Sequence, residues 1–328
     1  MKIIAFGCRE DEKPFFDELV SSGRFELKVT EKHLGPDTVS LAEGYDAVSV
    51  EGQCRADREM MDKLGSFGVR FFSTRTIGYN NIDLAAAKEN GIRCSNVSYS
   101  PYGVANYTVL LILVILRKFY HLIARSGVMD YSLKGMAGKE LQNMTVGIIG
   151  MGRIGKATAE CLSGFGCRII AYTPHPNEKT RALAEEVTME ELYRQADIIS
   201  LHTPLTKENF HMINRETIAR MKDGVYIINT ARGELIDTSA LIDAVESGKV
   251  GGVGVDTFEN ERDVIHIDHE TNAIHNRNML ALKAYPNVIV SPHAAFFTDQ
   301  ASRDMVYCSV EGLAGWLEGK ENPHEIRY

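Results

Sequence analysis

The chain has 328 residues, of which 44% are hydrophobic and 24% are charged, and its formal net charge is −8. This length allows two domains that each bury a core of their own, and the composition is that of an ordinary globular protein. The negative net charge argues against nucleic acid or an anionic membrane as a partner, because like charges repel. We therefore expect no nucleic-acid partner and no membrane partner.

Cysteine usage and hydropathy indicate where the protein works. The six cysteines form no CxxC pair and no dense framework, which predicts reduced thiols and a cytoplasmic location. Met1 and Lys2 lead into a short apolar run, so no signal peptide is expected. The most apolar stretch, residues 107–116, has about half the length that a membrane crossing needs, so we expect a buried helix there.

Short runs of β-branched and aromatic residues alternate with helical patterns in the first 96 residues. The predicted strands are "KIIAF", "FELKV", "DAVSV", "VRFFST" and "IRCSN". Strands and helices that alternate in this way predict a parallel sheet with helices on both faces. We therefore expect a first doubly wound domain over residues 1–99.

A strongly apolar helix is predicted next. Ser100 and Pro101 are typical of a helix start, as the N-cap and the first helical residue. The helix that follows, to about Lys118, is apolar on every side. Such a helix must be covered all round, by its own domains or by a second subunit. We expect a homodimer built around it.

The alternation of strands and helices starts again after the polar stretch "SLKGMAGKELQN". The predicted strands are "MTVGIIG", "RIIAY", "DIISL", "GVYIINT", "GGVGVDT" and "NVIVSPH". They predict a second doubly wound domain over residues 100–298. A closing helix over about residues 299–319 is expected to return to the first domain, so that residues 299–328 belong with 1–99.

Gly150, Gly152 and Gly155 form a GxGxxG motif between a predicted strand and a predicted helix. In this setting the glycines allow a tight turn, a close approach of backbone to a pyrophosphate, and close packing of helix on strand. The helix N-terminus then faces the phosphates. The motif alone is a weak signal, but strand, helix and second strand follow in the right order, so it predicts dinucleotide binding.

The second strand of this domain ends at Thr173, where a carboxylate for the ribose 2′-hydroxyl is expected. Without the acid, a 2′-phosphate meets no repulsion, and His175, Lys179 and Arg181 lie nearby in the sequence to offset its charge. The alternative is that Thr173 binds the ribose hydroxyls of NAD and that the basic residues are solvated. We favour NADPH use or tolerance.

Arg232, Glu261 and His293 each stand just past a predicted strand of the second domain. In open α/β sheets, ligands bind at the carboxyl ends of the strands. One such residue is usually a solvated loop residue, but three of complementary chemistry beside a nucleotide turn predict an active site. An arginine holds a carboxylate through two bonds. A histidine transfers a proton near neutral pH, and a carboxylate orients it and favours its imidazolium form.

Five segments, "GIIGMGRIG", "HTPLTKEN", "INTARGELID", "GVGVDTFENE" and "SPHAAFFT", resemble the D-specific 2-hydroxyacid dehydrogenases. The similarity covers essentially the whole chain. "NVSYSP" and the long loop after Asp256 are similar to the D-lactate dehydrogenase branch, which includes the vancomycin-resistance type dehydrogenase. The resemblance implies an α/β fold of two doubly wound parallel-sheet domains. One is a Rossmann-type dinucleotide-binding domain at 100–298, and the other is a flavodoxin-like substrate (catalytic) domain at 1–99 with 299–328.

The resemblance also implies a reaction, namely reversible hydride transfer that reduces a 2-oxo acid to the D-2-hydroxy acid. The cofactor would be NAD(H) or NADP(H), and the substrate pyruvate or a larger apolar 2-oxo acid. By the same resemblance Arg232 binds the substrate carboxylate and polarises its carbonyl, His293 is the acid/base, and Glu261 is its partner. Glu259 is a nearby competitor for that last role, but Glu261 holds the matching place.

Further site residues follow from the resemblance alone. The cofactor-binding set is Gly150, Gly152, Arg153, Ile154, Gly155, Thr173, Thr203, Pro204, Asn209, Thr230 and Asp256. Arg153 and Ile154 are placed on the pyrophosphate, and Asp256 on the nicotinamide amide. On the substrate side, the backbone N–H groups of Ile77 and Gly78 meet the carboxylate. Tyr99 and Phe296 border the side chain of the 2-oxo acid.

Two other functions fit this sequence less well. A dinucleotide-sensing corepressor-like binding protein shares the fold, but it needs docking surface or tails that this chain has little room for. A formate dehydrogenase requires glutamine where Glu261 stands. One loop is rich in residue types that bind metals. Its histidines do not have the i, i+4 spacing of ligands on a helix, and it contains no cysteine, so we expect no metal site. The residues of this loop are His266, Asp268, His269, Glu270 and His275.

Overall fold

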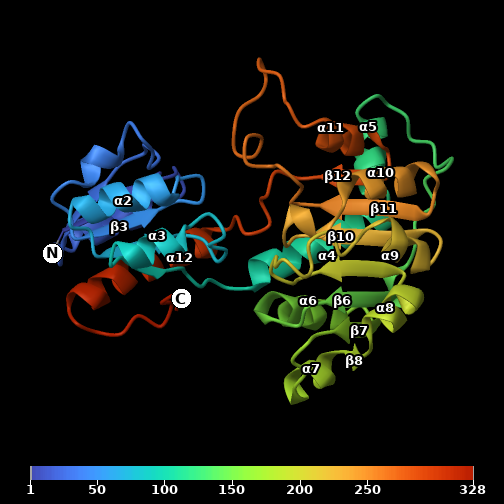
Figure 1. The fold of residues 1–328 in the computed structure, drawn as a ribbon. Helices are drawn as coiled ribbons and strands as arrows, with labels where there is room; N and C mark the ends of the chain where they lie inside the picture. Colours follow the sequence, from blue (N-terminus) through green and yellow to red (C-terminus); the bar gives the residue numbers. More distant parts are fainter. Residues whose placement is uncertain (1, 328) are drawn as a thin grey trace. The chain divides into compact units, whose positions relative to one another are not determined.

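The structure is a computed structural model that describes residues 2–327. The chain divides into two compact units (Figure 1). One unit is Met1–Ser100 with Phe297–Tyr328, and the other is Pro101–Phe296. Each unit contains one sheet in which all the strand pairs are parallel.

The first unit has a five-stranded sheet. Its strands are β1 (Lys2–Phe6), β2 (Glu26–Val29), β3 (Ala47–Val50), β4 (Phe71–Thr74) and β5 (Arg93–Ser95). Its helices are α1 (Lys13–Ser21), η1 (Val39–Ala42), α2 (Arg58–Ser66), α3 (Leu84–Glu89) and α12 (Asp299–Leu317). The strand order β2-β1-β3-β4-β5 is the flavodoxin-like order, as the resemblance implied.

The first strand shows why helices cover both faces of this sheet. Side chains of a strand alternate between the two faces, and all of β1 after Lys2 is buried. Ile3 and Ala5 pack in one core with residues of α1 and α12. Ile4 and Phe6 pack in another core with residues of α2 and α3. Helix α12, at the C-terminal end of the chain, therefore belongs to the core of the N-terminal unit.

The second unit has a seven-stranded sheet. Its strands are β6 (Thr145–Ile149), β7 (Arg168–Tyr172), β8 (Glu185–Glu186), β9 (Ile198–Leu201), β10 (Val225–Asn229), β11 (Val250–Val255) and β12 (Val288–Val290). The order β12-β11-β10-β9-β6-β7-β8 is the Rossmann order with one added strand at the edge. The predicted fold class, two doubly wound parallel sheets, is confirmed.

The helices of the second unit cover both faces of its sheet in the same way. They are α4 (Tyr102–Leu116), α5 (Phe119–Ser126), η2 (Leu141–Asn143), α6 (Arg153–Ser163), α7 (Glu178–Leu183), α8 (Met189–Gln195), α9 (Arg215–Arg220), η3 (Gly233–Leu235), α10 (Thr238–Glu246) and α11 (Arg277–Ala284). Residues of α4 and α6 share one core with the sheet. Residues of α8, α9 and α10 share the other.

Helix α4 corrects the predicted helix start. It begins at Tyr102, with Pro101 at the N-cap, and it ends at Leu116 because Lys118 adopts a left-handed backbone with φ of 50°. Its own unit buries most of its apolar surface, although Leu110 stays 50% exposed. The prediction of a buried helix over residues 107–116 is therefore confirmed, and its own unit provides most of the cover. Within residues 2–327 no single helix is long and apolar enough to cross a membrane, although the bent pair α4 and α5 passes on length and composition.

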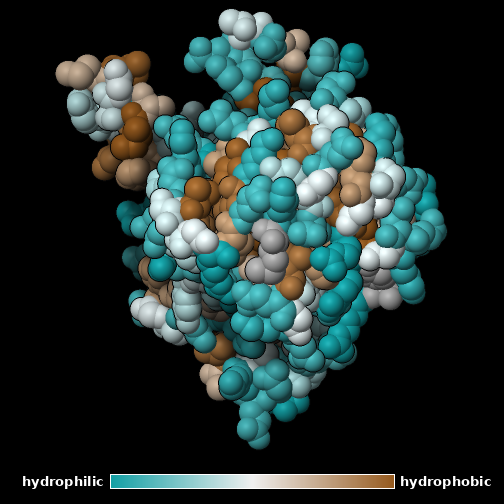
Figure 2. Space-filling view, turned by 90° about the vertical axis from the view of Figure 1, so that its left-hand side faces the viewer, coloured by the Kyte–Doolittle hydropathy of each residue, from teal (hydrophilic) through white to brown (hydrophobic). Residues whose placement is uncertain are grey.

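A group of large exposed apolar side chains lies in α5 and the segment after it. They are Phe119, Tyr120, Ile123, Val128, Met129, Tyr131 and Leu133. We refer to residues 119–133 as the apolar arm. Figure 2 shows hydrophobic residues projecting from a surface on which hydrophilic residues predominate. The sequence analysis assigned no helix to the arm, because α5 is short and starts at the unpredicted break at Lys118.

Candidate active site

The candidate residues of the second unit lie in loops at one edge of its sheet. Because the strands are parallel, their carboxyl ends share an edge. The loops after β6, β7, β9, β10, β11 and β12 begin there. They carry, in that order, Gly150, Thr173, Thr203, Arg232, Glu261 and His293.

The glycine-rich turn between β6 and α6 has the features that a dinucleotide needs. Gly150 has φ of 97°, and a Cβ there would lie 2.6 Å from the carbonyl oxygen of His202. A Cβ on Gly155 would lie 2.0 Å from the carbonyl oxygen of Gly150, so helix and turn pack too closely for a side chain. A Cβ on Gly152 would meet nothing within 4 Å. The second glycine thus leaves open space at the N-terminus of an 11-residue helix, where a pyrophosphate fits.

Residues around this turn set the charge that a cofactor would meet. Arg153 is exposed and Ile154 half-buried in the first turn of α6. Thr173 follows β7 and is half-buried. Arg181 forms an ion pair with Glu186 (3.0 Å). Lys179 instead lines a hollow of about 440 Å³ that Arg153 also lines.

The loops after β9 and β10 are held by their own side chains. The side-chain amide of Asn209 donates to the carbonyl oxygen of Pro204 (2.7 Å), and its oxygen accepts from the backbone N–H of Thr206 (2.7 Å). The hydroxyl of Thr230 lies 2.9 Å from that of Thr108 on α4. Thr203 is half-buried beside Pro204. The predicted cofactor residues of these loops therefore lie at the same sheet edge as the glycine-rich turn.

Glu261 and His293 form a direct pair. The Nδ1 atom of His293 lies 2.7 Å from Oε1 of Glu261, and since a carboxylate only accepts, Nδ1 is the donor. The backbone N–H of Phe258 donates to Oε2 of the same carboxylate (3.0 Å). The side chains of His293 and Glu261 are 28% and 18% exposed. The pair fixes the imidazole so that its Nε2 atom is left to meet a substrate.

Asp256 holds the loop that carries His293. Its side chain is fully buried. Its Oδ1 accepts from the hydroxyl of Ser291 (2.6 Å) and the N–H of Ala294 (2.9 Å), and its Oδ2 accepts from the N–H of Ala295 (2.8 Å). Its backbone oxygen accepts from the N–H of His293 (2.9 Å). These bonds stabilise His293 in a left-handed conformation with φ of 53°.

Glu259 belongs to a separate network. Its Oε1 lies 2.7 Å from Nε2 of His211, and its Oε2 accepts from the backbone N–H of Thr238 (2.9 Å) and from its hydroxyl (2.5 Å). The backbone turns between the two acids at Asn260, which has φ of 56°. The structure therefore brings Glu261, the carboxylate that the sequence analysis preferred, to His293, and it pairs Glu259 with His211. The sequence analysis missed His211, and no spacing pattern marks it.

Arg232 lies half-buried in the loop after β10. Its Nη1 donates to the carbonyl oxygen of Ala231 (2.6 Å), and across residues 2–327 it makes no ion pair within 4.0 Å. The next residue, Gly233, packs on the loop after β11, where a Cβ would lie 2.1 Å from the carbonyl carbon of Phe258. The Arg232 loop therefore lies beside the loop that carries Glu261, and the guanidinium retains N–H donors that can bind a carboxylate.

The first unit carries the other predicted carboxylate contacts in the loop after β4. The hydroxyl of Thr76 donates to the carbonyl oxygen of Gly78 (2.7 Å), and the side-chain amide of Asn96 donates to that of Ile77 (2.8 Å). No acceptor for the backbone N–H of Ile77 or Gly78 occurs within the described part of the chain. Two rigidly held N–H donors thus remain for an anion.

A buried ion pair supports this loop and was missed by the sequence analysis. Arg75, fully buried just before the loop, donates to both carboxylate oxygens of Glu12 (2.8 and 3.1 Å). It also donates to the carbonyl oxygens of Phe6 and Gly7 (3.0 and 2.8 Å) and to the hydroxyl of Ser49 (3.1 Å). These bonds tie the ends of β1 and β4 together. In the sequence Arg75 directly follows a predicted strand, where an arginine is usually exposed in a loop, so its burial could not be predicted.

The two predicted side-chain neighbours of the substrate lie in different units. Tyr99 is half-buried in the first unit. Phe296 is half-buried at the end of the second unit, with its ring centroid 6.2 Å from that of His293. Phe296 therefore borders the histidine within its own unit.

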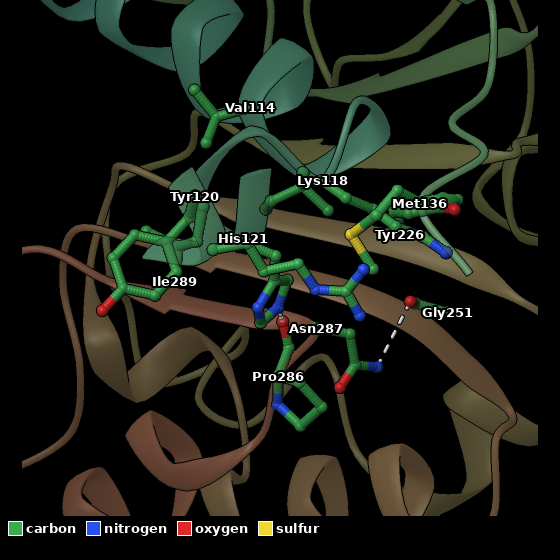
Figure 3. Close-up of a pocket in the computed structure, with 12 residues that line it drawn as sticks. Val114, Lys118, Tyr120, His121, Met136, Tyr226, Gly251, Pro286, Asn287 and Ile289 are labelled. Carbon is green, nitrogen blue, oxygen red and sulfur yellow. Dashed lines mark hydrogen bonds between the residues drawn. The ribbon is translucent and has the colours of Figure 1, made fainter. Parts of the chain in front are cut away.

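A cavity of about 340 Å³ lies at the other edge of the same sheet (Figure 3). Tyr226 and Gly251, near the starts of β10 and β11, line it, together with Lys118. In Figure 3 His121 points toward Pro286, with which its ring forms a hydrogen bond. None of the predicted catalytic or cofactor residues lines this cavity.

Within residues 2–327 no group of three or more histidine, cysteine, aspartate or glutamate side chains is arranged to hold a metal ion. In the loop rich in such residues, His269 contacts the carbonyl oxygen of Val264 (3.1 Å) and His266 that of His293 (3.3 Å). These two histidines therefore make hydrogen bonds to backbone oxygens.

Comparisons with known proteins bear on this geometry. The family model for the D-isomer specific 2-hydroxyacid dehydrogenase, NAD binding domain, matches residues 109–295, more than half of the chain. An aromatic 2-oxoacid reductase of Clostridium sporogenes is 42% identical over 315 residues, which are 95% of each chain. A D-lactate/D-glycerate dehydrogenase of Pediococcus acidilactici is 38% identical over 330 residues and the whole of both chains.

A solved structure is also similar along its whole length. It is the NAD-complexed form of a D-isomer specific 2-hydroxyacid dehydrogenase from Lactobacillus delbrueckii ssp. bulgaricus. It matches with a TM-score of 0.86 and 31% identity, and covers 100% of both chains. The chain therefore belongs to the D-isomer-specific 2-hydroxyacid dehydrogenase family, and it is an oxidoreductase that carries the family's NAD-binding domain.

Proposed function

We propose that the protein reduces a 2-oxo acid to the D-2-hydroxy acid, and catalyses the reverse reaction, with NAD(H) or NADP(H). When bound, the nicotinamide supplies or accepts the hydride. The observation that carries the proposal is the Glu261–His293 pair, at the same sheet edge as Arg232 and the glycine-rich turn. The activities named for the relatives, on aromatic 2-oxo acids and on D-lactate or D-glycerate, support it.

The substrate carboxylate is the part that this site is best equipped to hold. Arg232 has guanidinium donors without a carboxylate partner in the described chain, and such donors bind a carboxylate through two bonds. The backbone N–H groups of Ile77 and Gly78 offer further donors from the first unit. We assign residues 1–99 with 299–328 as the substrate domain and 100–298 as the dinucleotide-binding domain.

His293 is assigned the proton transfer. Glu261 accepts from Nδ1, so the Nε2 atom of the charged imidazole is the proton donor to the oxygen of the 2-oxo group. The carboxylate stabilises the positive imidazolium before transfer and orients the ring. Arg232 adds positive charge next to the oxygen on which negative charge develops. In the reverse direction neutral His293 accepts the proton from the hydroxyl group.

The test is the His293→Ala variant assayed with reduced cofactor and a panel of 2-oxo acids. General acid–base catalysis contributes about 10²- to 10⁴-fold, so kcat is expected to fall by that factor while cofactor binding persists. A variant that keeps near-normal kcat removes His293 from proton transfer. Wild-type protein that oxidises neither reduced cofactor with any 2-oxo acid overturns the proposed function itself.

We also propose that the enzyme uses NADPH at least comparably to NADH. Thr173 offers no negative charge to repel a 2′-phosphate, and no carboxylate occurs from Thr173 to Asn177. Lys179 and Arg153 line one hollow together with Lys156 and a single carboxylate, Glu160, and this excess of positive charge supports the proposal. Arg181 is already paired with Glu186.

The variant Thr173→Asp tests this preference. It is expected to shift the ratio of kcat/KM toward NADH by tenfold or more, because like charges at close range cost on the order of a few kcal/mol. A wild-type enzyme whose kcat/KM for NADH is already far above that for NADPH contradicts the proposal. In that case Thr173 binds the ribose hydroxyls of NAD well enough without a carboxylate.

We propose a homodimer in a reducing, cytoplasmic compartment. All six cysteines are free, as a reducing compartment requires. The apolar arm supports the dimer, because Val128 and Leu133 are 77% and 79% exposed and a monomer rarely presents so much apolar surface together.

The variant Val128→Asp/Leu133→Asp, examined by light scattering, is expected to dissociate the dimer. Val20→Asp is the matched control, since Val20 is 46% exposed and lies outside the arm. A wild-type monomer at micromolar concentration contradicts the proposal.

A further inference from the structure

His266 stands beside the proposed acid/base and has no role in the mechanism above. It lies in the long segment between β11 and α11, orange in Figure 1. Its ring centroid is 6.4 Å from that of His293 and 6.2 Å from that of Phe296. His293 and Phe296 are themselves 6.2 Å apart. The three rings therefore form a nearly equilateral group within the second unit.

The local structure holds His266 in an unfavourable backbone conformation. Its φ is 58°, in the left-handed region that residues with a Cβ rarely adopt. The residue before it, Ile265, is buried against Phe258 and Met279 and anchors the segment. Strained residues are found at functional sites when the surrounding structure determines their position. The side chain of His266 is nevertheless exposed, so burial does not explain its placement.

The hydrogen bond of His266 fixes which part of its ring faces outward. Its Nε2 atom lies 3.3 Å from the backbone oxygen of His293. A carbonyl oxygen only accepts, so Nε2 carries the hydrogen of this bond. The bond holds the ring on the His293 loop. The exposed part of the ring then lies next to the proton donor and to Phe296.

We propose that His266 is a specificity-determining residue, which with Phe296 forms a wall for the side chain of the 2-oxo acid. The inference rests on the function proposed above. Aromatic rings associate edge-to-face or offset at centroid separations of about 4.5–7 Å. A flat aromatic side chain can contact both rings, whereas the methyl group of pyruvate is too small to do so. The wall therefore favours aryl 2-oxo acids over pyruvate.

The test compares kcat/KM for phenylpyruvate and pyruvate in wild type and three variants. Wild type is expected to prefer phenylpyruvate. His266→Ala is expected to lower kcat/KM for phenylpyruvate about five- to tenfold, mainly through KM, and to change pyruvate much less. His266→Phe keeps a ring and is expected to retain the preference. His266→Gln keeps an N–H donor for the His293 oxygen but loses the ring, so it is expected to behave as His266→Ala does.

Three outcomes overturn the inference. In the first, wild type has the higher kcat/KM for pyruvate, or the ratio of kcat/KM for phenylpyruvate and pyruvate is the same in wild type and all three variants. In the second, His266→Gln retains wild-type kinetics with both acids while His266→Phe loses activity with both. That pattern assigns His266 to positioning the His293 loop. In the third, wild type turns over no 2-oxo acid, and this result overturns the proposed function as well. If wild type is active but the ratio of kcat/KM for phenylpyruvate and pyruvate is unchanged in the variants, only this inference is overturned.

Discussion

Replacing Glu261 by glutamine tests whether the carboxylate paired with His293 supports proton transfer. The carboxylate accepts two hydrogen bonds, from Nδ1 of His293 (2.7 Å) and from the N–H of Phe258 (3.0 Å). A glutamine side chain has one oxygen and one NH₂ group. If its oxygen accepts from His293, its NH₂ group faces the N–H of Phe258, and two donors oppose each other. If the amide group is flipped so that its oxygen accepts from Phe258, its NH₂ group faces Nδ1 of His293, and the histidine loses its acceptor.

The size of the effect follows from the same geometry. The side chains are 18% and 28% exposed, so solvent screens the pair only in part. A hydrogen bond to a charged group contributes about 1.5–3 kcal/mol, and about 1.36 kcal/mol corresponds to a factor of ten. The interaction with a positive imidazolium is lost in Glu261→Gln. We therefore expect kcat to fall by about 10- to 100-fold.

The assay follows oxidation of the reduced cofactor at saturating 2-oxo acid, with cofactor affinity measured separately. The matched control is Glu259→Gln, two residues away. Glu259 also accepts from a histidine, His211 (2.7 Å), but has no contact with His293 among the described residues. The control is expected to change kcat much less. Equal losses in the two variants, or an unchanged kcat in Glu261→Gln, refute the reasoning.

Three further predictions concern binding and stability. Arg232→Lys is expected to lower kcat and raise KM for the 2-oxo acid, because lysine lacks the two-pronged grip on a carboxylate; near-wild-type values of both show that the contact is misassigned. Arg75→Met removes two hydrogen bonds to the buried carboxylate of Glu12, which keeps its longer contact with the guanidinium of Arg9 (3.6 Å), so the free energy of unfolding is expected to fall by about 3 kcal/mol. The measurement is denaturant unfolding, and the control is Arg58→Ala, which breaks an exposed ion pair with Glu89. The control is expected to lose at most about 1 kcal/mol of the free energy of unfolding. Similar losses in both variants contradict the prediction. Burial lowers the pKa of His202 from 6.5 to about 4, so the unfolded chain binds a proton between these pH values and the folded protein does not. The free energy of unfolding is expected to fall by at most about 3 kcal/mol as the pH drops through that window. His202→Asn is expected to remove this part of the pH dependence, and an unchanged slope in the variant contradicts the assignment.

Most of the fold could be predicted because strands buried on both faces have a simple sequence signature. Runs such as "VGII" in β6 contain no polar side chain and are buried, as parallel strands covered by helices require. Strand β8 was missed because it consists of two exposed glutamates, Glu185 and Glu186, which carry no apolar pattern. Helix α5 was missed because the break before it depends on the left-handed backbone of Lys118, a residue that normally continues a helix.

The site was less predictable because side-chain partners depend on local backbone turns. Glu259 and Glu261 follow the end of β11 by four and six residues, so both were candidates for the partner of His293. The turn at Asn260 directs one toward His211 and the other toward His293. His266 precedes His293 by 27 residues, in a segment without a regular pattern, so its contact with His293 follows only from the folded path of that segment.

The most direct test of the account is the stereochemistry of the product. Wild-type protein is incubated with a 2-oxo acid and reduced cofactor, and the hydroxy acid is resolved on a chiral column. The account predicts that cofactor oxidation and product formation are equimolar, and that the product is the D-enantiomer. An L-product, a racemic product, or no hydroxy acid from any 2-oxo acid with either cofactor contradicts it.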